Sequence, residues 1–211
     1  MQLLHVIATP RGSKSNTLVV AEAFVEFLRE TRPELQVATR DLFAEDLPSV
    51  AGENIESKYT LMHGQAIAPS HADSWKEIEA LIHQFMAADV VLVSAPMWNF
   101  SIPYVLKYYI DCIVQPGYLF KFSDQGVPVG MCAGKRLVCV TTRGGDFSEG
   151  GPMHAYDLQE PYLRTIFGFV GIADQEYLHA QPMDVTPELR EAALTTAVNS
   201  ARRLALTPAA V

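Results

Sequence analysis

The sequence predicts an α/β protein with a doubly wound, five-stranded parallel sheet and helices on both faces. Three observations support this fold class. Short apolar runs alternate with longer segments in which apolar residues recur at helical spacing. The run at 89–95, Asp-Val-Val-Leu-Val-Ser-Ala, is apolar on both faces, as is typical of a central parallel strand covered by helices. Turn-forming residues such as Gln115-Pro116-Gly117 separate the segments.

The first half of the chain starts with a continuous apolar run over residues 2–8, which predicts a strand. Apolar residues then recur at helical spacing over 18–29, so a helix follows. Residues 35–40 alternate with a period of two and predict the second strand, which completes a βαβ unit with parallel strands. Residues 42–72 show no sustained periodicity, and we expect a short helix plus an excursion there that covers a site or a partner.

The second half repeats the alternation of helical and strand-like segments. The segment 118–122 alternates in character and predicts a short extra strand or an aromatic flap. The remaining predicted elements are helices over 73–88, 103–113, 158–170 and 187–206 and strands over 136–142 and 173–180.

Composition restricts the classes of function. The 211 residues, 49% hydrophobic and 19% charged, suit a single domain over 1–211. A net charge of -8 without a run of basic residues argues against nucleic acid or an anionic membrane as partner. The chain starts with a strand-like run in place of a basic leader, and no stretch approaches the ~20 apolar residues that cross a bilayer. We therefore expect a soluble, cytoplasmic protein.

Cysteine and histidine do not predict a reactive or metal site. Cys112, Cys132 and Cys139 form neither a CxxC pair nor an even disulfide set, so we interpret them as reduced packing residues. The six histidines lack metal-ligand spacing, and we predict no metal. His154 and Tyr156, which follow a glycine-rich segment, are the best of these side chains for contacting a substrate.

Three segments contain residues suited to binding a ligand, and each of them follows a predicted strand. They are Thr9-Pro10-Arg11-Gly12-Ser13-Lys14-Ser15-Asn16-Thr17, then Pro96-Met97-Trp98-Asn99-Phe100, then Thr142-Arg143-Gly144-Gly145. In an open parallel sheet the ligand lies outside the carboxyl ends of the strands, near the point where strand order reverses. With strand order 2-1-3-4-5, the three segments border one crevice. The sequence therefore predicts a single site at that edge.

Each segment can be interpreted either as part of a ligand-binding site or as having only a structural role. The hydroxyl-rich first segment suits a phosphate at a helix N-terminus, or it merely caps the helix. Trp98 and Phe100 flank one amide, Asn99, which suits a flat heteroaromatic ring, or the aromatics pack into the core. Gly144 and Gly145 allow close approach of backbone N–H groups to a ligand, or they form a plain turn. The absence of a GxGxxG motif after the first strand disfavours a dinucleotide-binding Rossmann core.

Taken together, Pro-Arg-Gly-x-x-Ser-x-Thr, Met-Trp-Asn-Phe and Thr-Arg-Gly-Gly resemble the FMN-dependent NAD(P)H azoreductase and quinone oxidoreductase family. The resemblance implies a flavodoxin-like fold and a homodimer with FMN near the subunit interface. It also implies substrate contacts from Phe122 and Phe169. Trp98 stands where the family usually has Tyr, which leaves substrate preference open. The FMN contacts it implies are Thr9, Ser15, Asn16, Thr17, Met97, Trp98, Asn99, Phe100, Thr142, Arg143, Gly144 and Gly145.

The mechanism we expect is a ping-pong cycle. NADH or NADPH delivers a hydride to the flavin and leaves, and a quinone or azo compound then takes two electrons at the same place. Holding the reactants in geometry supplies ~7–11 kcal/mol, so we predict no dedicated catalytic acid or base. The alternative is a flavodoxin-like one-electron carrier that docks on protein partners. The length of the chain, the 42–72 segment and the aromatic stretch 118–122 favour the enzyme.

Overall fold

The computed structural model describes residues 1–207; residues 208–211 of the predicted 1–211 domain lie outside the described part. Five parallel strands form one sheet in the order β2-β1-β3-β6-β7, which confirms the predicted doubly wound pattern. The strands are β1 (Gln2–Ile7), β2 (Gln36–Asp41), β3 (Val90–Ser94), β6 (Arg136–Thr142) and β7 (Asp174–Ala180). All five lie within two residues of their predicted bounds.

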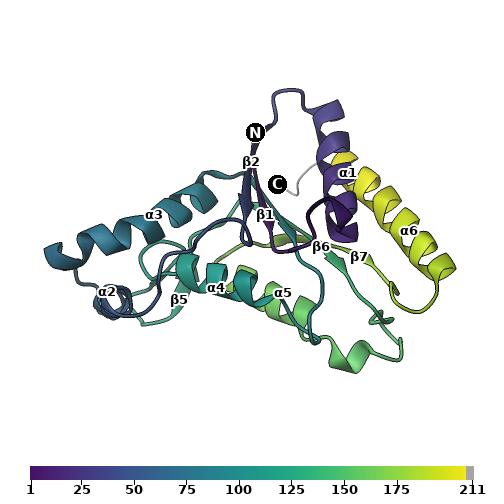
Figure 1. The fold of residues 1–211 in the computed structure, drawn as a ribbon. Helices are drawn as coiled ribbons and strands as arrows, with labels where there is room; N and C mark the ends of the chain where they lie inside the picture. Colours follow the sequence, from purple (N-terminus) through teal and green to yellow (C-terminus); the bar gives the residue numbers. More distant parts are fainter. Residues whose placement is uncertain (208–211) are drawn as a thin grey trace.

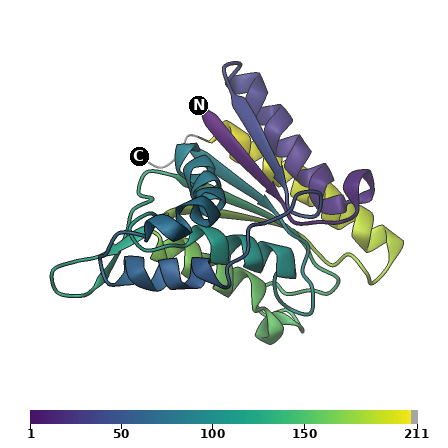
Figure 2. The same cartoon turned by 60° about the vertical axis from the view of Figure 1, so that its left-hand side comes forward.

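Helices cover both faces of the sheet, as Figures 1 and 2 show. One face carries α1 (Asn16–Thr31) and α6 (Pro187–Leu206), and the other carries α3 (Ala72–Ala87), α4 (Tyr104–Ile113) and α5 (Gln159–Phe169). The helix α2 (Glu53–Met62) lies in the segment 42–72, where a short helix was expected. Among residues 1–207, no helix is both long and apolar enough to cross a membrane.

Two hydrophobic cores, one on each face of the sheet, fix the helices. Trp75 on α3, Leu106 on α4 and Leu163 on α5 pack in one core. In the other, α6 presents a buried stripe of Ala193, Ala197, Ala201 and Ala205 at four-residue spacing. Small side chains at this spacing let α6 approach α1 closely.

A short antiparallel hairpin was only half predicted. Its first strand, β4 (Phe120–Phe122), falls in the alternating segment 118–122, whereas β5 (Pro128–Gly130) was not expected. The hairpin is attached to the end of α5, because the Cys132 amide donates to the Val170 carbonyl at 2.8 Å. Since α5 ends where β7 is about to begin, the hairpin lies at the amino end of the sheet (Figure 2).

The register places the carboxyl ends of the three central strands side by side. Ile7 pairs with Ser94, and Ser94 pairs with Val140 two residues before the end of β6. Backbone hydrogen bonds extend this alignment past the strands, from the Ala8 amide to the Ser94 carbonyl and from the Ala95 amide to the Val140 carbonyl. The three segments that follow β1, β3 and β6 therefore begin at one edge of the sheet.

Candidate cofactor-binding site

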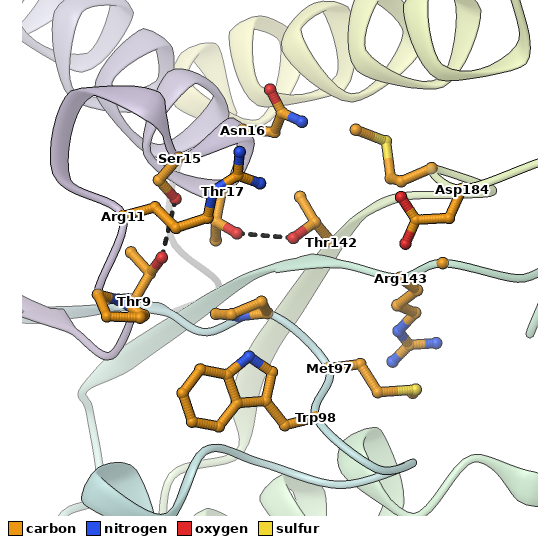
Figure 3. Close-up of a pocket in the computed structure, with 14 residues that line it drawn as sticks. Thr9, Arg11, Ser15, Asn16, Thr17, Met97, Trp98, Thr142, Arg143 and Asp184 are labelled. Atoms are coloured by element: carbon orange, nitrogen blue, oxygen red, sulfur yellow. Dashed lines mark hydrogen bonds between the residues drawn. The ribbon is translucent and has the colours of Figure 1, made fainter. Parts of the chain in front are cut away.

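The three segments surround one pocket of about 350 Å³ at this edge (Figure 3). Its volume lies within the ordinary range of small-molecule sites. The loop after β7 completes the wall. The lining residues are Thr9, Pro10, Arg11, Ser15, Asn16, Thr17, Pro96, Met97, Trp98, Thr142, Arg143, Gly144, Met183 and Asp184.

The N-terminus of α1 opens into this pocket. Ser15 is the N-cap, and its side chain accepts from the Leu18 amide at 3.4 Å. The same hydroxyl lies 3.1 Å from the Thr9 hydroxyl, and both side chains are buried. The first amides of a helix have no partner within the helix, and its dipole favours negative charge. Capping and anion binding are therefore compatible here, because the cap satisfies Leu18 while Asn16 and Thr17 line the pocket.

Side-chain and backbone contacts tie the segments to one another. The Thr17 and Thr142 hydroxyls lie 2.7 Å apart, which joins the start of α1 to the end of β6. The Met97 amide donates to the Thr142 carbonyl at 2.9 Å, which joins the loop after β3 to the same residue. Thr142 therefore connects both neighbouring segments.

Trp98 forms the apolar wall of the pocket. Its indole packs against Phe43, with ring centroids 5.8 Å apart, and against Tyr104 at 6.4 Å. The residues after it form a tight turn, in which Trp98 and Ser101 exchange two backbone hydrogen bonds of 2.9 Å. Asn99 and Phe100 occupy this turn with φ of 47° and 70°. Positive φ is strained for a bulky residue such as Phe100, and such strain is concentrated at functional sites.

The loop after β6 presents backbone to the pocket at Gly144. A Cβ there would lie 2.8 Å from an Asp184 carboxylate oxygen, so a side chain at this position would displace that carboxylate. The Asp184 amide donates to the Gly144 carbonyl at 3.0 Å. Gly144 therefore permits close approach between two loops that both line the pocket.

Arg143 has a different environment from its neighbours. Its side chain leaves the backbone in the opposite direction from that of Thr142 (Figure 3) and is 1% exposed. Its Nη1 lies 2.9 Å from an Asp157 carboxylate oxygen. Burial lowers the pKa of Arg143 from its usual value, and the carboxylates of Asp157 and Glu160 oppose that effect. The nearby Glu160 accepts a hydrogen bond from His179, which lowers its pKa to about 2.

Most of the predicted cofactor-binding residues line the pocket, and five predicted site residues do not. Asn99, Phe100 and Gly145 lie just outside it. Phe122 and Phe169, with exposed fractions of 43% and 39%, lie on the hairpin and at the end of α5, toward the opposite end of the sheet. Their roles stay predictions.

Met183 and Asp184 line the pocket but were not predicted from the sequence. Both follow β7, the strand next to β6. Their position after a fifth predicted parallel strand is the sequence feature that could have identified them as pocket residues. Their segment lacks the glycine and hydroxyl pattern that marked the other three loops. His154 and Tyr156 are exposed and lie outside the lining residues.

The fold and the position of the pocket define a doubly wound α/β protein with its ligand cleft at the strand-order reversal. A family model described as "Flavodoxin-like fold" matches residues 1–205. A relative from Pseudomonas syringae pv. tomato is 38% identical over 97% of this chain and 98% of its own length. One from Pseudomonas fluorescens is 35% identical over 97% and 95%. Both are named FMN-dependent NADH:quinone oxidoreductases.

The solved structures include an azoreductase from Bacillus anthracis with a TM-score of 0.87. It is 29% identical, and the match covers 97% of this chain and 98% of that one. The chain therefore belongs to the flavodoxin-like family and, within it, to the family of the FMN-dependent NADH:quinone oxidoreductases.

Proposed function

We propose that the chain is an FMN-dependent oxidoreductase that transfers two electrons from NADH to quinones and azo compounds. The observation that carries this proposal is the convergence of three distant segments on one pocket, with a helix N-terminus on one side and an indole on the other. The names of the relatives supply the cofactor and the substrate classes.

The residues present fit FMN. The N-terminus of α1 supplies amide donors and a favourable dipole for the phosphate, and Ser15, Asn16 and Thr17 line that part of the pocket. Thr9 and Thr142, which line the pocket, would contact a polar chain between phosphate and ring. Met97 and Trp98 provide apolar surface for a flat ring, and Gly144 lines the same pocket beside Asp184.

FMN, when bound, supplies the hydride-accepting and electron-transferring chemistry. The protein binds and orients it. Trp98, packed on Phe43 and Tyr104, would form the apolar wall against which the ring lies. The backbone amide of Gly144, which lines the pocket, would stabilise negative charge on the polar edge of the ring. We assign no side chain as acid or base, because orientation alone contributes ~7–11 kcal/mol.

The proposal includes a homodimer with FMN near the subunit interface. Phe122 and Phe169 lie toward the opposite end of the sheet from the pocket, so their predicted substrate contacts require a second copy of the chain. Exposed apolar side chains beside the pocket are consistent with such a partner. They are Phe100, Tyr104, Tyr156 and Leu158, with exposed fractions of 43%, 68%, 56% and 60%. Analytical ultracentrifugation tests this part, and a monomer at micromolar concentration would contradict it.

The decisive experiment is to purify the protein and record its visible spectrum before and after incubation with FMN. NADH oxidation is then followed with a quinone and, separately, with an azo dye. We expect a yellow protein that oxidises NADH with both acceptors and gives parallel double-reciprocal plots, as a ping-pong cycle requires. A protein that cannot be loaded with FMN would refute the proposal. A yellow protein that accepts electrons only from another protein would favour the carrier.

A further inference from the structure

We propose that Asp157 and Gln159 are positioning residues, which act through the buried guanidinium of Arg143 to hold the loops after β3 and β6 in register for FMN. We call Arg143, Asp157 and Gln159 the loop clamp. The dependence on FMN rests on the proposed function, whereas the coupling of the two loops does not.

The loop clamp is centred on Arg143, the residue directly after β6. Its Nη1 pairs with Asp157 at 2.9 Å, and its Nε donates to the side-chain oxygen of Gln159 at 3.3 Å. The side chains of Arg143 and Asp157 are 1% and 8% exposed, and Gln159 is fully buried. Bonds to a charged group in a buried setting are stronger than exposed ones and hold their partners in one geometry.

Gln159 carries the connection on to the loop after β3. Its side-chain amide donates to the Ala95 carbonyl at 3.2 Å. Ala95 directly precedes the segment 96–100, which carries Met97 and Trp98. Asp157 in turn fixes the backbone at Gln159. Its second carboxylate oxygen accepts hydrogen bonds from the backbone N–H groups of Gln159, at 2.9 Å, and Glu160, at 3.1 Å. The start of α5 is thereby attached to both loops through buried side chains.

A second contact from the same stretch reaches the strained turn. The amide of Leu158, which lies between the two clamp residues, donates to the Phe100 carbonyl at 3.0 Å. Phe100 has a φ of 70°, a conformation that persists only where surrounding contacts impose it. The position of 157–159 therefore bears on Ala95 and Phe100, at the two ends of the segment that carries Met97 and Trp98.

The same strand offers a comparison at its other end. Arg136, the first residue of β6, is also buried and lies 3.7 Å from Asp174, whose side chain is 16% exposed. That pair lies at the amino end of the sheet, away from the pocket loops. A buried ion pair is not by itself evidence of stability, since apolar replacements are often tolerated. The difference between the two pairs is that only the loop clamp joins segments that line the pocket.

The test compares Asp157→Asn and Gln159→Met with the control Asp174→Asn. Asp157→Asn keeps the shape of the side chain and removes the nearer of the two carboxylate charges that face Arg143, since Glu160 lies 3.7 Å from its Nη2. Gln159→Met keeps the approximate length of the side chain and removes the bridge to Ala95. Each variant is assayed for FMN dissociation constant, for the thermal midpoint of the apoprotein, and for amide hydrogen exchange of the apoprotein. If Asp157→Asn fails to fold, Gln159→Met still tests the clamp, because in that variant Arg143 keeps its ion pair with Asp157.

We expect both clamp variants to weaken FMN binding at least tenfold and to speed exchange in 96–101 and 142–145 together. We expect Asp174→Asn to change the dissociation constant less than twofold, even where its thermal midpoint falls as far. If FMN affinity falls in proportion to the thermal midpoint in all three variants, the loop clamp has no specific role in FMN binding and the proposal fails. Faster hydrogen exchange in only one of the two loops would also contradict it. Wild-type protein that binds no FMN refutes the proposed function and the clamp's role in FMN binding; the exchange data alone then decide the coupling of the loops.

Discussion

The hydrogen bond between Thr17 and Thr142 allows the linkage between the first and third loops to be measured. Their hydroxyls are 2.7 Å apart, and Thr17 is 1% exposed whereas Thr142 is half-buried. Replacing Thr142 with Val leaves the Thr17 hydroxyl buried without this partner, which costs about 1–3 kcal/mol. Replacing Thr17 with Val leaves a hydroxyl that reaches water and costs about 0.5–1.5 kcal/mol. We therefore expect unequal single effects and a coupling energy of about 1 kcal/mol.

Urea unfolding of the wild type, the two single variants and the double variant gives the four free energies of this cycle. FMN titration of the same proteins shows whether the linkage also preorganises the pocket. Thr165→Val is the control, because Thr165 is exposed on α5 and its hydroxyl donates to the Pro161 carbonyl of its own helix. Free energies that add to within about 0.3 kcal/mol would show that the hydroxyls do not interact, and would refute the reasoning.

Two further predictions concern stability. Burial lowers the pKa of His5 from 6.5 to about 4, so as the pH falls His5 is protonated in the unfolded state before it is protonated in the folded state. The contribution of His5 to the free energy of unfolding should therefore be fully present above pH 6.5 and fall by about 3 kcal/mol toward pH 4. His5→Gln should flatten urea-unfolding data across that window, and an unchanged profile would contradict the assignment. Separately, a Cβ at Gly130 would lie 2.2 Å from the Val170 backbone, so Gly130→Ala should cost about 3 kcal/mol or more and lower the thermal midpoint. Gly168→Ala, where the nearest atom is a side-chain nitrogen at 3.5 Å, should be neutral or stabilising.

The elements that the sequence predicted well are those whose signal is local. Strand β6 has its predicted bounds, Arg136–Thr142, because its apolar run over 137–140 and the two threonines after it lie between Arg136 and Arg143. Helix α1 begins two residues before its predicted start, since the N-cap Ser15 precedes the first apolar repeat. Strand β5 was missed because Pro128–Gly130 is only three residues long and exposed, and its pairing with β4 is a tertiary contact.

The candidate site divides in the same way. The N-terminus of α1 was predicted from the sequence because a capping residue and the helix it starts are adjacent in the chain. The position of Arg143 in its loop was also predicted, but the direction of its side chain was not. That direction depends on Asp157 and Gln159, 14 and 16 residues further along, and Gln159 is itself bonded to the carbonyl of Ala95, just after β3. Asp184 was missed for the same reason, since only the sheet places it beside Gly144.

This division has a consequence for how the pocket holds its shape. The side of the pocket proposed for the phosphate needs little beyond α1, because unpaired amides at a helix N-terminus are already oriented by the helix itself. The side proposed for the ring lacks such local support, because Asn99 and Phe100 adopt positive φ at a cost of order 1–3 kcal/mol each. Two backbone bonds between Trp98 and Ser101 and one from Leu158 oppose that cost. Changes near α5 should therefore disturb the ring side first and leave the phosphate side intact, although α5 contributes no lining residue to the pocket.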